Sequence, residues 1–416
     1  MRVLWFTNTP CNYQSSFGGY NGGGWMSALQ NEIIKQEDIS LGICFCQDGQ
    51  PLKVEQDKTI YYPTQSHKKK LKNKILDIVK YKDLSRDKVL WNHYINHFKN
   101  VINDFKPDIV EIFGSELYMG LAAIAAENIP HVLHIQGLLS LYIYIYLPPG
   151  VSLSSYYFQD WNPKNIYNRF QLYTYWKRSC YREQEILKYC KHVIGRTDWD
   201  ENASKILNPN RIYHYGGEIL RPEFYEEVER KIPEKLTIVT TSSNPMYKGF
   251  DYVLQTAYIL KNKIGADFDW LVYGNVNPSF AEKLTKIKHE EVNVKLVGVA
   301  DAVTLRDAIS SATLYFQPSY IENSPNSVCE AQILGVPVVA TNVGGTSSLI
   351  EHGRTGFLIP TNDPYTAVGR IMEVYNERNL NKEIGINART VASKRHDRIY
   401  IVNNLISTYK EIIEDS

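Results

Sequence analysis

The sequence lacks the features that mark several classes of protein. It has 46 basic and 45 acidic side chains in 416 residues, so no overall charge attracts it to nucleic acid, which is not an expected partner. No apolar run in it reaches the roughly 20 residues that a helix needs to span a bilayer. Residues 1–6 resemble a buried strand and not a secretory signal peptide. We therefore expect a cytoplasmic protein.

Cysteine is also scarce and is poorly placed for a metal site. The six cysteines form neither a CxxC pair nor another ligand spacing. Cys44 and Cys46 fall on one face of an expected strand, which suits reduced thiols in a core. The pattern predicts structural cysteines and no metal.

What the sequence does have is a repeated alternation of short apolar runs with amphipathic segments. This pattern predicts an α/β protein with parallel sheets, and 416 residues are enough for two domains. We expect two doubly wound Rossmann-like domains facing a central cleft, with boundaries at 1–213 and 214–396 and a final helix in 397–416 that returns to the N-terminal domain. The expected strands are Val3–Thr7, Ser40–Cys46, Asp108–Phe113, His131–Ile135, His192–Gly195, Leu236–Thr241, Trp270–Gly274, Val294–Val297, Thr313–Gln317, Val336–Thr341 and Gly356–Ile359.

The densest group of polar residues follows the expected strand at 313–317. Ser324 and Pro325 suit the start of a helix, with Ser324 as the N-cap. The first amides of such a helix, at Asn326, Ser327 and Val328, can bind a diphosphate without a metal. Glu322 before the helix and Glu330 within it would then contact the sugar and the ribose of a nucleotide-sugar. The alternative is a capped helix with two solvated glutamates.

A lysine follows the expected strand at 236–241. Lys248 could neutralise the charge that develops on a departing nucleoside diphosphate. The alternative is a solvated lysine in a turn, which is the usual state of a lysine.

Several segments together resemble one family. Glu322 and Glu330, which are separated by seven residues, match a paired-glutamate motif of the retaining glycosyltransferases of family 4, which have the GT-B fold. Similarity to the same family extends over Gly335–Thr341, Val343–Gly345 and Glu351–Ile359. The resemblance implies that Glu322 contacts the donor sugar and that Glu330 contacts the ribose.

The same resemblance makes Lys248 the second of two cations that bind the donor phosphates. The first is usually an arginine, but Ser243 stands at that position here. Asn244, or Arg196 from the first half, is our candidate to replace it. Arg196 could equally act structurally by pairing with Asp200.

The first half holds two further matches to the family. Gly23 and Gly24 resemble its paired glycines, which adjoin the donor diphosphate. Gln136 stands where the family has a histidine near the anomeric carbon, and a glutamine cannot exchange a proton near neutral pH. Transfer stays feasible because the departing phosphate can take the acceptor proton. We expect a core role for His134.

Residues on the acceptor side are less clearly marked. Glu116 ends a strand and could orient an acceptor, and two or three of the aromatic residues crowded between Leu141 and Trp176, with Tyr142 as the candidate, could stack on sugar rings. Segment 67–79 is basic and amphipathic, so it predicts either peripheral contact with an anionic membrane or a solvated helix face.

These features favour a retaining, metal-independent glycosyltransferase that moves a sugar from a UDP- or GDP-sugar to a saccharide or lipid-linked acceptor in surface polysaccharide or glycolipid synthesis. No cofactor is expected. The alternatives are another GT-B enzyme, such as a nucleotide-sugar epimerase or a phosphorylase, and a nucleotide-sugar-binding protein with little turnover.

Overall fold

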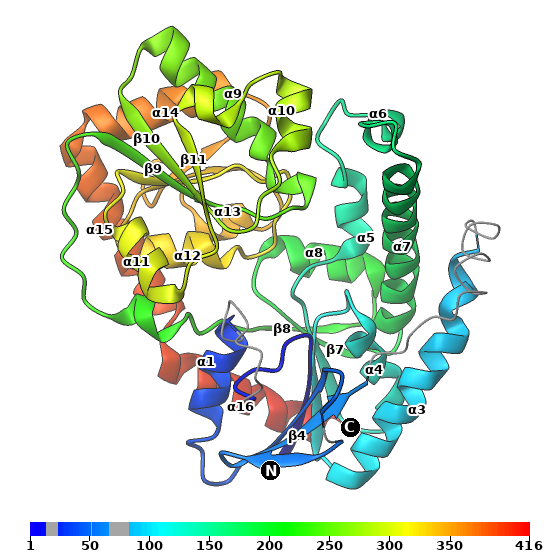
Figure 1. Ribbon diagram of the computed structural model, residues 1–416. Coiled ribbons are helices and arrows are strands. Elements are labelled where there is room, and N and C mark those ends of the chain that lie inside the picture. Colours follow the sequence, from blue (N-terminus) through cyan, green and yellow to red (C-terminus); the bar gives the residue numbers. More distant parts are fainter. Residues whose placement is uncertain (14–23, 51, 66–82) are drawn as a thin grey trace. The chain divides into compact units, whose positions relative to one another are not determined.

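The computed structural model describes residues 1–13, 24–50, 52–65 and 83–416. The chain divides into two compact units (Figure 1). Unit 1 comprises residues 1–144, 152–219 and 398–416, and unit 2 comprises residues 145–151 and 220–397. The chain therefore changes unit at Ile219–Leu220, and the short segment 145–151 belongs to unit 2.

Unit 1 is built on one sheet of strand order β3-β4-β2-β1-β5-β6-β7-β8, in which every pairing except β3 with β4 is parallel. Its strands are β1 (Arg2–Thr7), β2 (Ser40–Cys46), β3 (Val54–Gln56), β4 (Thr59–Thr64), β5 (Ile109–Phe113), β6 (His131–His134), β7 (His192–Gly195) and β8 (Ile212–Tyr215). Its helices are α1 (Gly24–Ile33), α3 (Lys88–Phe105), α4 (Ala122–Ala125), α5 (Leu139–Tyr142), α6 (Leu153–Tyr157), α7 (Pro163–Leu187), α8 (Asp198–Leu207) and α16 (Arg398–Glu414), with 3₁₀ turns η1 (Leu84–Asp87), η2 (Tyr118–Leu121) and η3 (Ile143–Ile145).

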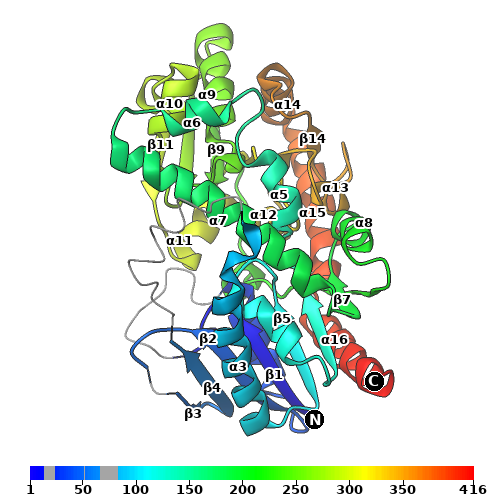
Figure 2. The same cartoon turned by 90° about the vertical axis from the view of Figure 1, so that its right-hand side faces the viewer.

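Alternation along β1 explains why helices cover both faces of this sheet. Successive side chains of a strand point to opposite faces, and Phe6 packs edge-on against Phe98 of α3. Trp5 points the other way and donates from its indole nitrogen to Tyr409 of α16 at 3.0 Å. Figure 2 shows α3 and α16 on either side of the strands. The last helix thus completes the core of unit 1.

Two buried histidines of unit 1 make its stability depend on pH. The rings of His192 and His214 stack with centroids 5.3 Å apart, and burial lowers the pKa of both, although Asp415 and Glu411 act in the opposite direction. Because the folded pKa lies below the unfolded value of about 6.5, the neutral rings stabilise the fold above that pH, and this contribution is lost as the pH falls through the folded pKa.

We therefore expect the melting temperature to fall between about pH 7 and pH 5, and we expect His214→Gln to reduce the slope of that fall. Thermal unfolding followed by circular dichroism measures both slopes. Parallel slopes for the two proteins would contradict this role of the histidine pair.

Unit 2 has a fully parallel sheet of order β11-β10-β9-β12-β13-β14. Its strands are β9 (Leu236–Thr241), β10 (Phe268–Tyr273), β11 (Val294–Gly298), β12 (Leu314–Gln317), β13 (Val338–Thr341) and β14 (Phe357–Ile359). Its helices are α9 (Phe250–Ile259), α10 (Ser279–Thr285), α11 (Ala302–Ser310), α12 (Asn326–Ile333), α13 (Thr346–Leu349), α14 (Pro364–Asn376) and α15 (Arg378–Arg395), with shorter turns η4 (Pro222–Tyr225), η5 (Met246–Lys248), η6 (Leu260–Ile264) and η7 (His289–Val292).

The two faces of this sheet bury separate apolar clusters. Ile238 and Phe316 point toward α9 and α14. Val239 and Tyr315, the neighbouring residues of the same strands, point toward α11 and α12. Unit 2 is therefore doubly wound, as predicted, and α12 lies against the strands that carry the candidate site.

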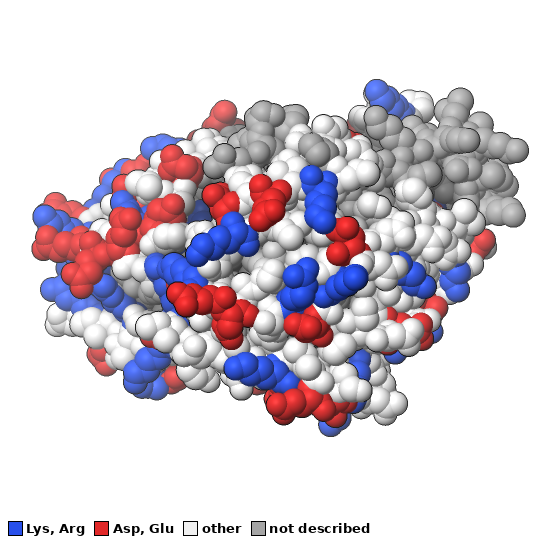
Figure 3. All heavy atoms as spheres, turned by 90° about the horizontal axis from the view of Figure 1, so that it is seen from below, with Lys and Arg blue, Asp and Glu red and all other residues white. Residues whose placement is uncertain are grey.

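The predicted α/β class with two parallel sheets is confirmed. The predicted strands are all present with small shifts at their ends, whereas β3, β4 and β8 were missed. None of the helices in the described ranges combines the length and the hydrophobicity that a bilayer span requires. Acidic and basic side chains are interspersed on the face drawn in Figure 3. The predicted basic segment 67–79 lies outside the described residues.

Candidate functional site

The candidate site lies where the winding of the unit 2 sheet reverses. β9 and β12 are neighbours, but the chain continues from β9 to β10 on one side and from β12 to β13 on the other. The loops at the carboxyl ends of two such strands diverge and leave room for a ligand. Lys248 lies in the loop after β9, and Glu322 lies in the loop after β12.

The two loops meet in an ion pair. Lys248 Nζ lies 2.6 Å from Glu322 Oε1, and Glu322 is 6% exposed. Burial lowers the pKa of Lys248, but the attraction and hydrogen bond of Glu322, together with Tyr247 and Tyr315, raise this pKa above its usual value. Since an ammonium group has three N–H donors, Lys248 can hold Glu322 and still donate to a phosphate oxygen.

A buried network fixes the position of Glu322. The same Oε1 accepts from the Ser319 hydroxyl at 2.7 Å and from the Gln317 amide at 3.1 Å. Gln317 in turn accepts from the Tyr315 hydroxyl at 3.2 Å, and Thr241 at the end of β9 contacts that hydroxyl at 2.6 Å. The carboxylate is therefore oriented by both strands of the switch point before any ligand binds.

Two glycines allow the backbone to approach this loop closely. A Cβ on Gly344 would lie 1.8 Å from the Glu322 carbonyl oxygen, and a Cβ on Gly249 would lie 2.2 Å from the Pro318 carbonyl oxygen. The Gly345 amide donates to the Glu322 carbonyl at 3.0 Å. The loop that carries Glu322 thus packs closely against Gly249 on one side and against Gly344 and Gly345 on the other.

The start of α12 differs from the prediction in one detail. The helix begins at Asn326, and the residue in the N-cap position is Pro325 instead of Ser324. The Val328 amide donates to the Pro325 carbonyl at 2.9 Å, so the first turn of the helix uses it internally. Of the three amides predicted to bind a diphosphate, that of Val328 is thus already bonded within the helix, whereas the roles of Asn326 and Ser327 at the positive end of the helix dipole stay predictions.

Glu330 has a partner that the sequence analysis missed. Arg221 holds its carboxylate with two bonds, from Nε to Oε1 at 2.8 Å and from Nη2 to Oε2 at 2.9 Å, and Glu330 is 4% exposed. A carboxylate can accept about four hydrogen bonds, so this pairing orients Glu330 and is compatible with hydroxyl donors on the same oxygens. The only sequence signal was an arginine before Pro222, at the expected join of the domains.

If Glu330 accepts from the ribose, as the sequence analysis predicts, Arg221 orients the carboxylate for that contact. On that prediction, Arg221→Gln should weaken nucleoside diphosphate binding about tenfold, because an unoriented Glu330 would lose one well-placed hydroxyl contact of about 1.4 kcal/mol. Calorimetric titration of UDP and GDP measures this change. The matched control is Arg370→Gln, which breaks the pair of Arg370 with Glu373 at 2.6 Å on α14. Equal losses in the two variants would contradict the prediction.

Ser243 and Asn244 lie beside a small cavity of about 50 Å³ that Pro148 also lines. Asn244 Oδ1 accepts from the Asn277 backbone amide at 2.9 Å. Asn244 is exposed and Ser243 half-buried. Both side chains are uncharged, so within the loop after β9 the positive charge rests on Lys248.

In unit 1, several candidates gather at the carboxyl ends of β5, β6 and β7. The Arg196 guanidinium pairs with Glu218 and donates to Gln136 Oε1 at 3.3 Å. Asp200 instead accepts from the Arg196 backbone amide at 2.9 Å. The predicted side-chain pair of Arg196 with Asp200 is thus replaced by a pair with Glu218, and the donor-binding role of Arg196 stays a prediction.

Glu116 and Tyr142 lie at the same end of the sheet. Burial, and after it the charge of Glu183, raises the pKa of Glu116 to about 7. Both residues border the space beside Gly137. A Cβ on Gly137 would lie 3.3 Å from Glu116 Oε1 and 3.5 Å from the ring of Tyr142. A carboxyl group with this pKa can donate or accept a hydrogen bond near neutral pH.

The remaining predicted residues of unit 1 divide as follows. His134 is 1% exposed and contacts Glu111 at 2.8 Å, which confirms its core role. Gly24 begins α1 with a φ of +59°, and Gly23 lies outside the described residues. In the part of the chain that the structure describes, no group of three His, Cys, Asp or Glu residues is arranged to hold a metal ion.

Comparisons with known proteins agree with this geometry. Residues 223–391, which hold Lys248, Glu322 and Glu330, match the family model described as glycosyl transferases group 1. A capsular polysaccharide biosynthesis glycosyltransferase, CapM of Staphylococcus aureus, is 24% identical over 230 residues, which are 55% of this chain and 54% of CapM. The chain spans about half the length of curated relatives that it matches.

Solved structures resemble the whole chain. The sucrose-phosphate synthase of Thermosynechococcus elongatus has a TM-score of 0.70 at 16% identity, with all of both chains covered. HepE of Anabaena, solved in complex with UDP-glucose, has a TM-score of 0.65 at 16% identity over 99% of this chain and 100% of that chain. At these identities the likeness shows the fold, and that fold is GT-B.

Proposed function

We propose that this chain, a GT-B protein whose residues 223–391 match the group 1 glycosyltransferases, is a retaining glycosyltransferase that uses a nucleotide-diphosphate sugar. The observation that carries the proposal is the Lys248–Glu322 pair at the switch point of the unit 2 sheet. The buried Arg221–Glu330 pair lies farther along α12. The two carboxylates thus stand on either side of the first turn of this helix.

The chemistry follows from these positions. The bond between the anomeric carbon and the β-phosphate oxygen breaks, and the nucleoside diphosphate leaves with the electron pair. Lys248 and the positive end of α12 stabilise the negative charge that develops on the leaving group. In this proposal they take the place that a metal ion has in other transferases. Glu322 binds sugar hydroxyls and Glu330 binds the ribose.

The acceptor oxygen then bonds to the anomeric carbon from the face that the phosphate left, so the configuration is retained. Its proton passes to the departing phosphate, because Gln136 cannot accept one. Glu116, with a pKa of about 7, is our candidate to orient the acceptor hydroxyl, and Tyr142 is our candidate for its ring. By the similarity to CapM, the acceptor we propose is a saccharide or a lipid-linked saccharide.

Incubation of the full chain with a panel of UDP- and GDP-sugars tests the proposal. We expect slow hydrolysis of one donor with retained anomeric configuration, and faster turnover with a saccharide acceptor. An epimeric nucleotide-sugar as the product would instead identify an epimerase. Tight binding without turnover of any donor and acceptor pair would identify a binding protein, which is the candidate that Ser243 and Gln136 favour.

Ser243 offers a change that should strengthen the site. We expect Ser243→Arg to tighten nucleoside diphosphate binding about tenfold, because a second cation beside Lys248 can bind a phosphate with charge-assisted hydrogen bonds. Ser243→Gln, which adds length but no charge, is the control. Unchanged or weaker binding of the arginine variant at low salt would place the diphosphate elsewhere.

A further inference from the structure

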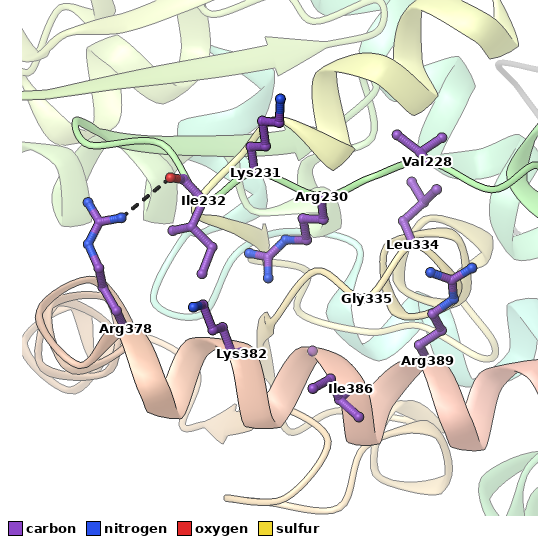
Figure 4. A pocket seen from close by; sticks show the side chains of 11 residues that line it. Val228, Arg230, Lys231, Ile232, Leu334, Gly335, Arg378, Lys382, Ile386 and Arg389 are labelled. Carbon is purple, nitrogen blue, oxygen red and sulfur yellow. Dashed lines mark hydrogen bonds between the residues drawn. The ribbon is translucent and has the colours of Figure 1, made fainter.

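A second concave site lies on unit 2, at the amino ends of β9 and β13. Lys248 and Glu322 lie at the opposite, carboxyl ends of the strands. This groove, which we call the α15 groove, has a volume of about 520 Å³, a size typical of small-molecule sites. It is bounded by the segment 228–232 before β9, the turn at Leu334 and Gly335 before β13, and one face of α15. Figure 4 shows these three walls.

The charge of the groove is of one sign. Five of its lining residues are basic and none is acidic; they are Arg230, Lys231, Arg378, Lys382 and Arg389. In Figure 4 the Lys231 side chain extends away from α15, whereas the Arg230 and Lys382 side chains approach each other across the groove. Such a concentration contrasts with the near balance of charge in the whole chain.

Three of these five cations make no side-chain hydrogen bond or ion pair with any residue in the described ranges; they are Lys231, Lys382 and Arg389. Arg378 donates only to the backbone carbonyls of Ile232 and Pro233, at 3.4 and 3.3 Å. Lys231, Arg378, Lys382 and Arg389 are exposed, so water solvates them, and their mutual repulsion would be relieved by a bound anion.

Arg230 is fixed in place and is only partly satisfied. Its Nη2 donates to the Thr313 carbonyl at 3.1 Å and to Asn381 Oδ1 at 2.9 Å, while its buried Nε has no acceptor among the described residues. Burial lowers the pKa of Arg230 to about 10, which still leaves it charged at neutral pH. Gly385 makes room for it, because a Cβ there would lie 3.2 Å from Arg230 Nη1.

The dipole of α15, which forms one wall, adds to the positive electrostatic potential of the groove. Arg378 and Lys382 lie near the start of α15, where the positive end of the helix dipole disfavours cations and favours anions. The negative end of the α12 dipole lies nearby and favours one cation. It does not explain five cations in one groove. Ile386, which is 66% exposed, provides an apolar surface beside the charges.

We propose that the α15 groove is a second anion-binding site, which takes a phosphate-bearing ligand through Arg230, Lys382 and Arg389. Guanidinium groups bind phosphate with paired hydrogen bonds, and the volume suits a ligand between a sugar phosphate and a nucleoside diphosphate in size. The phosphate can come from a soluble metabolite or from a lipid headgroup. The site is distinct from the donor site and does not depend on the proposed transfer.

Calorimetric titration of the full chain with inorganic pyrophosphate tests the proposal. We expect the double variant Lys382→Gln, Arg389→Gln to bind at least tenfold more weakly, because it removes two cations that donate charge-assisted hydrogen bonds to the phosphates. The matched control is Lys263→Gln, Lys394→Gln, which removes the same charge from two exposed residues of unit 2 outside the groove, and it should stay within about twofold. Lys248→Met, a change in the donor site, should leave this binding event in place.

Vesicles distinguish the two sources of phosphate. If the groove binds a headgroup, vesicles of phosphatidylglycerol and phosphatidylcholine bind the wild-type chain, pyrophosphate competes, and the groove variant fails to bind. If only pyrophosphate binds, the ligand is soluble. The proposal is overturned if the wild type shows no saturable pyrophosphate binding, if the groove variant binds normally, or if the matched control loses as much affinity as the groove variant.

Discussion

Lys248→Met is expected to lower kcat/KM for sugar transfer about a hundredfold to a thousandfold, the usual cost of removing one group that stabilises developing charge. Methionine keeps most of the length of the side chain but cannot donate to a departing phosphate. The effect should fall mainly on kcat, because the charge develops in the transition state. Steady-state kinetics with the donor identified from the panel measures it.

The control for this variant is a second lysine–glutamate pair of unit 2. Lys288 lies 2.9 Å from Glu282, and the carboxylate of that pair is also buried. Lys288→Met therefore also removes an ion pair to a buried carboxylate, although Lys288 is more exposed than Lys248 (63% against 26%), and it should leave kcat unchanged. Lys248→Arg should recover part of the lost activity. A Lys248→Met enzyme that turns over at the wild-type rate would remove the lysine from the mechanism.

Gly344→Ala is expected to lower activity by about a hundredfold through displacement of Glu322, since a shift of about 1 Å in a reacting group can cost that much. A methyl group on Gly344 would lie 1.8 Å from the Glu322 carbonyl oxygen, so the loop must move and the Gly345 hydrogen bond to that carbonyl must break. The φ of +50° at Gly344 adds roughly 1–2 kcal/mol of backbone strain.

Gly353→Ala separates the clash from the strain. Gly353 also has a positive φ, +78°, but nothing lies within 4 Å of the position that its Cβ would take. The melting temperature should fall in both variants. Activity should fall only in Gly344→Ala, because only that change displaces the Glu322 carboxylate. If the two variants keep the same kcat/KM, the position of Glu322 does not control the reaction.

Much of unit 2 could be predicted from the sequence because its strands are short, apolar and separated by clear breaks. The same pattern predicted that Lys248 and Glu322 each follow a strand. It did not give the order of the strands, so the switch point and the contact between the two side chains became known only from the structure. The predicted roles of Glu322, Glu330 and Lys248 in catalysis remain proposals that the variants above test.

Other features depend on contacts between distant segments, which local patterns do not encode. Arg221 is 109 positions from Glu330 in the chain, and no spacing rule connects them. β8 was missed because Ile212–Tyr215 is short and half exposed. The one-residue error at the start of α12 arose because Ser324 is an ordinary N-cap residue, whereas the structure places Pro325 there.

The most direct test of the account is a crystal structure of the full chain with whichever of UDP and GDP binds more tightly. We predict phosphate oxygens within hydrogen-bonding distance of Lys248 Nζ and of the first amides of α12, with the ribose hydroxyls on Glu330. A nucleotide bound elsewhere in the chain, with Lys248 and Glu330 contacting only their protein partners, would contradict the account.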